Sequence, residues 1–133
     1  MKKWMICFVG IVLIVAFGYM VWNNEDGKQR EIRLINEYQA IKHPEGADLV
    51  HYKLNRKIIK RWISSEYTYP INNDDVKQYY DQELVNNGWK KIKYNSKPGT
   101  VFYAYEKDNL RIVLGPYKEK SWTIYMGYPD AEY

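Results

Sequence analysis

The chain has 133 residues, a single cysteine and a formal net charge of +4, which allows one small domain with one appendage. Without Lys2 and Lys3, 18 basic residues stand against 16 acidic ones, so the bulk charge argues against a nucleic-acid-binding protein. The cysteine, Cys7, lies in the most apolar stretch, so the rest of the chain can have no disulfide and no thiolate chemistry.

An uncharged, apolar run extends from Trp4 to Trp22. As a helix this run would be about 28 Å long, close to the roughly 30 Å hydrocarbon core of a bilayer. Aromatic residues lie near both of its ends, where their rings favour the headgroup region. Lys2 and Lys3 precede the run and the acidic sequence NNEDG follows it, which predicts a cytoplasmic N-terminus. We therefore expect residues 1–22 to be a single-pass cell-membrane anchor and the rest of the chain to be extracytoplasmic.

Cleavage of this segment is the alternative. Ala16 and Gly18 form a small-x-small pattern that a signal peptidase can read, which would give a secreted protein. The apolar run continues past this pattern through the sequence YMVW, and this continuation favours a retained anchor.

Residues 23–43 are predicted to be a polar linker and a juxtamembrane helix. The helix is indicated by apolar residues at three-residue spacing: Ile32, Ile35, Tyr38 and Ile41. It can be a stalk that leaves the membrane or a helix packed on the domain. Pro44 and Gly46 end it.

Residues 44–133 are predicted to form an extracytoplasmic α+β domain that opens with a β-hairpin. Val50, Tyr52 and Leu54 alternate with polar residues and are the expected inner face of the first strand. We place the turn at Asn55-Arg56. The return strand also has a helix-like pattern of isoleucines, but the sequence YTYP at its end favours a strand.

Within the sequence DDVKQYYDQELVNNGW, residues 74–89, a helix is predicted that ends at Asn87-Gly88. Asn72 or Asn73 can cap it, and the two aspartates lie in its first turn, where the helix dipole favours negative charge. Five residues have predicted structural roles. Val76, Tyr80 and Leu84 form the buried stripe of the helix, Gly88 ends it, and Trp89 folds back onto its last turn.

The remainder predicts an antiparallel meander with strands at residues 89–94, 100–107, 110–115 and 121–128 and a tight turn at Asp108-Asn109. The expected faces are Val101, Tyr103 and Tyr105 on one strand, and Trp122, Ile124 and Met126 opposed to Thr123 and Tyr125 on the last. After the membrane helix the order is α-β-β-α-β-β-β-β. Short turns pair strands antiparallel, so we expect a small antiparallel sheet covered by a helix.

No residue pattern calls for a cofactor, a metal ion or a catalytic group. The two histidines, His43 and His51, belong to no metal-binding motif, and no serine lies in a nucleophile motif. Asp74 and Asp75, or Glu66, could serve as catalytic carboxylates, although the aspartates are more simply explained as helix N-terminal charge. We favour a non-catalytic binding module. The alternatives are an envelope hydrolase that uses Asp or Glu, and an immunity-type protein that protects its host at the membrane.

Two surface features suggest partners. A basic cluster in the predicted hairpin could contact anionic headgroups or wall polymers, or it could be a solvated edge: Lys53, Arg56, Lys57, Lys60 and Arg61. The second feature is the excess of tyrosine, 14 in the chain, a residue common at binding surfaces. The candidate binding surface is therefore Tyr103, Tyr105, Tyr125, Lys57, Lys60 and Arg61. Expected partners are the lipid bilayer, through residues 4–22, and an envelope protein, glycan or anionic polymer.

The segment from Tyr67 to Trp89 resembles a pattern in small bacterial envelope proteins with a domain of unknown function. In that pattern a strand leads to a helix of the form V-x-x-Y-Y-x-x-x-L-x-x-x-G-W, here Val76 to Trp89. The resemblance implies an α+β fold and a membrane-anchored envelope protein. Its motif consists of structural residues, so it assigns no catalytic residue.

Overall fold

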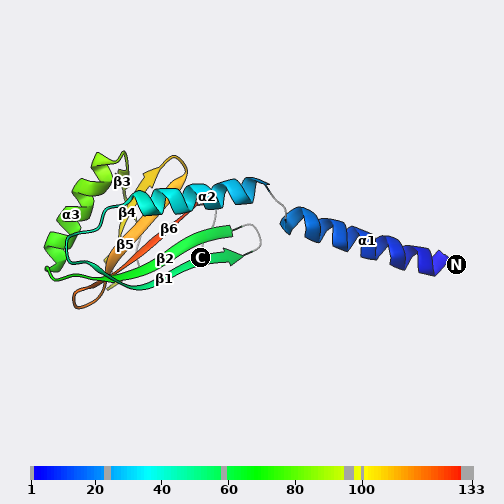
Figure 1. Cartoon of the computed structure of the whole chain (residues 1–133), viewed down its shortest axis with the longest axis horizontal. Helices are drawn as coiled ribbons and strands as arrows, with labels where there is room; N and C mark the ends of the chain where they lie inside the picture. The colour runs from blue at the N-terminus through cyan, green and yellow to red at the C-terminus, as the bar shows by residue number, and fades with distance from the viewer. Residues whose placement is uncertain (1, 23–24, 58–59, 95–97, 100, 130–133) are drawn as a thin grey trace.

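The computed structural model describes residues 2–22, 25–57, 60–94, 98–99 and 101–129. Within these residues it has three helices and six strands, in the predicted order (Figure 1). The elements are α1 (Lys2–Trp22), α2 (Glu25–Ala40), β1 (Asp48–Lys57), β2 (Lys60–Thr68), α3 (Asn73–Asn86), β3 (Lys90–Ile92), β4 (Tyr103–Lys107), β5 (Leu110–Lys118) and β6 (Ser121–Gly127). The predicted α+β class is confirmed.

The six strands form one sheet in the order β1-β2-β6-β5-β4-β3, and every neighbouring pair is antiparallel. The pairing of β2 with β6 joins the hairpin to the meander, with Tyr67 opposite Trp122 and Ile63 opposite Met126. Because α3 follows β2, the chain crosses over the sheet before β3 begins at the far edge.

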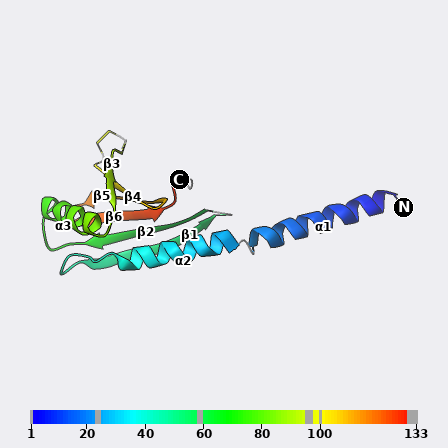
Figure 2. The ribbon, with the colours of Figure 1, turned by 90° about the horizontal axis from the view of Figure 1, so that it is seen from above.

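Both α2 and α3 cover the same face of this sheet. The α2 helix lies against β2 and β6 and runs alongside the β1–β2 hairpin, while α3 lies against β3 (Figure 2). Their apolar side chains join those of the sheet in one core, whose fully buried members include Leu34, Ile63, Val76, Tyr80, Leu84, Tyr105, Ile112, Trp122, Ile124 and Met126. The helices therefore hold the sheet as a two-layer unit.

The stripe with which α2 packs on the domain overlaps the predicted one, since Ile35, Tyr38 and Ile41 contact the core, but it is centred on Leu34. Leu34 is 0% exposed at its centre, whereas Ile32 is 53% exposed. A strict three-residue spacing rotates by about 60° at each step, so Ile32 and Ile41 lie on opposite sides of a helix. The buried set is Leu34, Tyr38 and Ile41, at intervals of four and three. Since α2 shares the core, the folded unit begins before residue 44.

The β1–β2 hairpin is confirmed, but its turn is not at Asn55-Arg56. Those residues pair with Trp62 and Arg61, and the strand runs on to Lys57. The two residues between the strands, 58–59, lie outside the described part of the chain. Leu54 packs on the core as predicted, whereas Val50 is 58% exposed beside an irregularity in the register. Asparagine and arginine were consistent with a turn, but the ladder continues past them to the pair of Lys57 with Lys60.

The predicted roles in α3 are confirmed. Asn72 caps the helix, its Oδ1 accepting a hydrogen bond of 2.9 Å from the amide of Asp75. The stripe of Val76, Tyr80 and Leu84 is buried. Gly88 ends the helix with φ +89°, a conformation that disfavours a side chain. Trp89 then folds back and is 3% exposed, and its amide donates to the Leu84 carbonyl at 2.9 Å.

The meander agrees with the prediction in its turn at Asp108-Asn109 and in its last strand. Asp108 and Asn109 both have positive φ, as a two-residue hairpin turn requires. Trp122, Ile124 and Met126 are buried, in the predicted alternation. The predicted face of β4 is wrong at Val101, which precedes the strand and is 53% exposed. The strand β5 also continues through the sequence PYK, which was predicted to be a linker.

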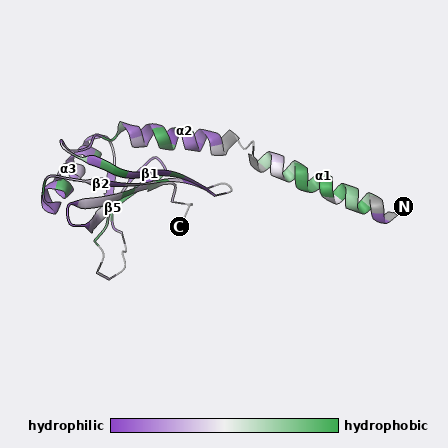
Figure 3. Ribbon diagram, turned by 60° about the horizontal axis from the view of Figure 1, so that its bottom comes forward, coloured by the Kyte–Doolittle hydropathy of each residue, from purple (hydrophilic) through white to green (hydrophobic). Residues whose placement is uncertain are grey.

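The α1 helix is apolar and exposed. Figure 3 colours most of it as hydrophobic, in contrast to the largely hydrophilic α2. Its described side chains from Met5 to Met20 have no core to pack on, and Phe8, Ile14 and Phe17 are each about 70% exposed. Among the residues that the structure describes, no helix is both long and apolar enough to cross a membrane.

Truncation of the α3 stripe should destabilise the domain. Leu84→Ala leaves a cavity between α3 and the sheet, and we expect the free energy of unfolding to fall by about 2–5 kcal/mol. Val85→Ala, at a neighbouring position that is 54% exposed, is the matched control and should change stability by less than about 0.5 kcal/mol. Urea unfolding of the full chain in detergent, followed by tryptophan fluorescence, measures both. Equal effects of the two changes would contradict the assigned packing.

Candidate functional site

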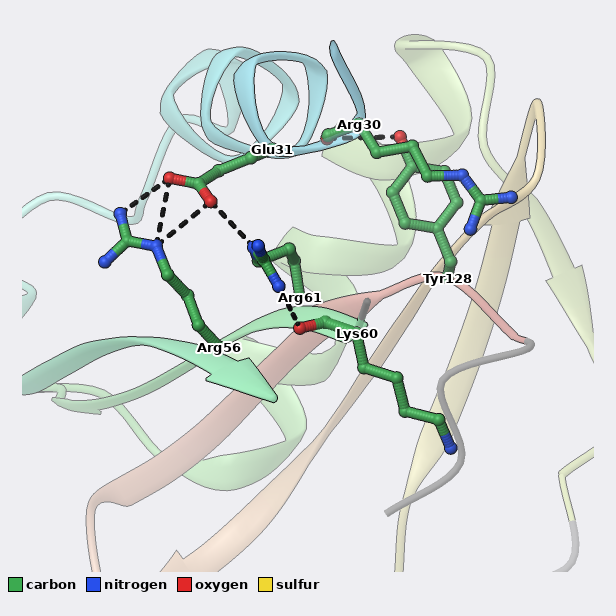
Figure 4. Close-up of polar contacts among 6 residues, drawn as sticks. All are labelled: Arg30, Glu31, Arg56, Lys60, Arg61 and Tyr128. Carbon is green, nitrogen blue, oxygen red and sulfur yellow. Dashed lines mark hydrogen bonds and ion pairs between the residues drawn. The ribbon is translucent and has the colours of Figure 1, made fainter. Parts of the chain in front are cut away.

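The strongest polar cluster lies where α2 meets the β1–β2 hairpin (Figure 4). Glu31 of α2 accepts hydrogen bonds from two arginines, one on each strand. The Nη2 of Arg56 is 2.6 Å from Oε1, and the Nε of Arg61 is 2.9 Å from Oε2. Arg61 also donates to the Lys60 carbonyl at 3.0 Å. One carboxylate thus ties both strands of the hairpin to the helix.

The two arginines change the acidity of the carboxylate. The hydrogen bond from Arg56 lowers the pKa of Glu31 against the opposing effect of burial, and Arg61 lowers it further. In return, Glu31 raises the pKa of Arg56. The side chains of Glu31 and Arg61 are 19% exposed and that of Arg56 is 58% exposed, so water reaches the outer part of the cluster.

A second contact holds α2 on the other side of this cluster. The hydroxyl of Tyr128 donates to the Arg30 carbonyl at 3.2 Å, and the Arg30 guanidinium lies 4.7 Å from the centre of the Tyr128 ring. These two residues line an open cavity of about 240 Å³ together with Asn109 and Pro129. The cavity is shallow and has a single cationic side chain among its lining residues.

The six residues of the predicted binding surface do not form one patch. Lys57, Lys60 and Arg61 belong to the hairpin beside Glu31. Tyr125 is half-buried on the face away from the helices, because its neighbour Ile124 faces the core. Tyr103 is half-buried and stacks on Trp122 with ring centroids 6.1 Å apart.

Tyr105 was wrongly placed on this surface. It is 0% exposed, and its hydroxyl donates to Asp81 of α3. It faces the helix layer because it lies opposite Ile112 in the sheet. Burial raises the pKa of Tyr105, and the hydrogen bond to Asp81 raises it further by a smaller amount. Tyr105 therefore joins α3 to β4 instead of meeting a partner.

Much of the tyrosine excess forms a buried network between α2, α3 and β2. The hydroxyl of Tyr80 is 2.7 Å from Nδ1 of His43 and 2.8 Å from the hydroxyl of Tyr69. The His43 ring stacks on Tyr67 at 4.1 Å, and the Tyr67 hydroxyl is 3.1 Å from that of Tyr38. Every member thus finds a hydrogen-bond partner inside the fold, which a buried polar group requires.

Burial governs the ionisation of this network. It lowers the pKa of His43, against a smaller opposing effect of Glu83, so the imidazole is held neutral. It raises the pKa values of Tyr80, Tyr69 and Tyr38, so these phenols stay protonated. The network is an internal polar layer. The sequence signalled it only by the number of tyrosines, because its members come from three separate elements.

The nearest approach to a nucleophile and base among the described residues is Ser121 with Glu66. The Ser121 hydroxyl donates to Glu66 Oε1 at 2.7 Å, but Ser121 is only 3% exposed, which denies a substrate access to its Oγ. Asp81 is bound by Tyr105 and Lys91, and Glu106 by Arg111. Within the described part of the chain, no group of three His, Cys, Asp or Glu residues could hold a metal ion.

Comparison of the chain with protein-family models, with curated proteins and with solved structures gives no match. The candidate site therefore rests on its own geometry.

The contact of Glu31 with the hairpin should make stability depend on pH in the acid range. Because the pKa of Glu31 is lowered on folding, its contribution is complete above the ordinary value of 4.5 and is lost as the pH falls through the lowered pKa. Glu31→Gln should reduce the free energy of unfolding at pH 7 by about 1 kcal/mol or less, and should flatten its fall below pH 4.5. Glu45→Gln, at an exposed position, is the control. Unfolding curves between pH 7 and pH 3 that are identical for Glu31→Gln and the wild type would refute the contact.

A second pH dependence should arise from His43. Below the ordinary histidine pKa of 6.5, His43 binds a proton in the unfolded chain, whereas its lowered pKa disfavours protonation in the folded chain. The free energy of unfolding should therefore decrease as the pH is lowered, by at most about 1.4 kcal/mol per pH unit. His43→Phe keeps a ring on Tyr67 and should remove this slope between pH 7 and pH 5. His51→Gln, which changes the exposed histidine, should keep it. Denaturant unfolding at four pH values measures the slopes, and a slope unchanged in His43→Phe would show that His43 is accessible to protons.

Proposed function

We propose that the chain is a single-pass membrane protein whose α+β domain is a non-catalytic binding module at the outer face of the membrane. The observation that carries this proposal is α1, an apolar helix with its side chains exposed. The other support comes from the domain, where the described polar groups are engaged with one another.

The large apolar side chains of α1 are costly to leave in water. Leaving one such side chain in water instead of burying it costs about 1.5–3 kcal/mol. Phe8, Ile11, Leu13, Ile14 and Phe17 are each more than 60% exposed along the helix. A lipid environment removes this cost, and a helix satisfies its own backbone hydrogen bonds there. The proposed anchor is the full sequence run from Trp4 to Trp22; the side chains at positions 4, 21 and 22 lie outside the described part of the structure.

The proposed role is binding because the polar groups of the domain are arranged for contact and stability. The Ser121–Glu66 pair is closed to substrate, and His43 is held inside the tyrosine network. Accessible basic groups are found at the hairpin end of the sheet, where Arg56 and Lys57 are exposed. Such a surface fits an anionic partner of the envelope better than a reaction.

A charge in the middle of α1 should prevent membrane insertion. Leu13→Lys adds a penalty of about 3 kcal/mol at the centre of the run. In bacterial cells that express the full chain, we expect the wild type to remain in the membrane pellet after alkaline carbonate extraction and Leu13→Lys to be released. Tyr117→Lys, which changes an exposed apolar residue of the domain, is the control and should remain in the pellet. Release of the wild-type chain by carbonate would contradict the proposal.

The orientation needs its own measurement, because Lys28, Arg30, Arg33 and Lys42 follow the run and weigh against the charge of Lys2 and Lys3 under the same rule. The chain offers a clean probe, since Cys7 is its only cysteine. In the Cys7→Ser background, Lys118→Cys places a thiol at the exposed end of β5. A membrane-impermeant maleimide should label this thiol in intact spheroplasts. Labelling only after the cells are opened would place the domain in the cytoplasm.

A further inference from the structure

The basic end of the β1–β2 hairpin lies close to the end of α1. We define this basic hairpin end as Lys53, Arg56, Lys57, Lys60 and Arg61. The first residue of α2, Glu25, follows Trp22 after two residues, which span at most about 11 Å. Glu31, the residue that binds Arg56 and Arg61, lies about 9 Å further along α2. Any orientation of the connection therefore leaves Glu31, the residue that binds the hairpin end, within roughly 20 Å of the end of α1.

The contacts of α2 fix the direction in which this end points. Leu34 and Tyr38 hold α2 in the core, and Glu37 pairs with Lys107 at 3.2 Å. At the start of the helix, Glu31 binds the hairpin. The hairpin end and the beginning of α2 consequently lie at the same end of the domain, the end from which α1 leaves, as Figures 1 and 2 both show.

The sequence of this end is basic. The segment from Leu49 to Ser65 contains all five basic residues of the hairpin end and no acidic residue. Among the described residues, the carboxylate of Glu31 pairs with Arg56 and Arg61, while Lys53 and Lys57 are exposed to solvent. The hydrogen bonds to Glu31 hold both arginines in place, and the side chain of Arg56 remains 58% exposed. Figure 4 shows the Lys60 side chain extending away from Glu31.

An aromatic residue lies at the same end. Trp62 is half-buried and pairs with Asn55 and Gly127. Its neighbour Ile63 faces the core, so Trp62 lies on the sheet face away from the helices. Tryptophan next to basic residues is the combination that favours the headgroup region of a bilayer.

We propose, on the basis of the membrane anchoring proposed above, that the basic hairpin end binds the phosphate groups of anionic lipid headgroups in the membrane that holds α1. A basic residue near an anionic membrane surface contributes about 1 kcal/mol, so several together orient the domain on the bilayer. The carboxylate of Glu31 acts as the positioning group, because it aligns both arginines with the start of α2.

Lysine footprinting on the full wild-type chain tests this binding. The chain is placed in nanodiscs of phosphatidylcholine alone or with phosphatidylglycerol, and an acylating reagent is followed by mass spectrometry. We expect acylation of Lys57 and Lys60 to slow by about fivefold in the anionic discs, the factor that corresponds to roughly 1 kcal/mol. Lys118 and Lys120 are the internal controls because both are exposed: Lys118 ends β5 and Lys120 lies in the turn that follows it. The register pairs Lys118 with Ser121, and Ser121 with Thr68, which places both lysines at the end of the sheet opposite the hairpin. Their rates should stay the same.

Charge variants separate a specific arrangement from a general effect of anionic lipid. Lys53→Gln with Lys57→Gln removes two exposed charges from the hairpin end and should abolish most of the lipid-dependent protection of Lys60. Lys118→Gln with Lys120→Gln removes the same charge from the opposite end and should leave that protection unchanged. All four positions are exposed, so neither pair threatens the core.

Four outcomes would overturn the proposal. Equal acylation of Lys57 and Lys60 in the two kinds of disc would do so while leaving the membrane anchor intact. Equal protection by inorganic phosphate added to phosphatidylcholine discs would identify free phosphate, not lipid, as the ligand. Loss of protection in the control pair of variants would show a bulk charge effect. A chain that does not enter the discs at all would refute the anchor, and with it this binding.

Discussion

The seating of α2 on the sheet is the contact on which the rest of the arrangement depends. Leu34, Tyr38 and Ile41 bring the helix into the same core as β2 and β6, in a domain that has no disulfide to hold it. The polar contacts of Glu31 and Glu37 then fix the helix against the hairpin on one side and β4 on the other. Since α2 begins two residues after α1 ends, this seating also sets which end of the domain lies nearest to α1.

Local patterns allowed much of the fold to be predicted. The cap at Asn72, the glycine at position 88 and the turn at Asp108-Asn109 depend on neighbours in the sequence, and each has the expected geometry. The face of α2 was predicted only in part: Tyr38 and Ile41 are buried, but Ile32 is exposed because a three-residue spacing does not keep residues on one side of a helix. The pairing of strands that are distant in the sequence could not be predicted, because nothing in the sequence indicates that β2 lies beside β6.

The candidate site shows the same division. Lysines and arginines in the hairpin were evident in the sequence, but their carboxylate partner was missed because Glu31 lies 25 and 30 positions away from Arg56 and Arg61. Tyr105 was assigned to a surface because alternation gives the two faces of a strand without saying which is covered. Several other tyrosines, which the sequence offered as candidate binding residues, are hydrogen-bonded to one another inside the fold.

The central claim is that the hairpin end of the domain faces the membrane that holds α1. The most direct measurement compares energy transfer to a headgroup acceptor from a fluorophore at Lys57→Cys with that from Lys120→Cys, each in the Cys7→Ser full chain in bilayers. The two positions lie at opposite ends of strands of up to ten residues, about 30 Å apart along the sheet. Our account predicts clearly stronger transfer from position 57. Equal transfer, or stronger transfer from position 120, would contradict it.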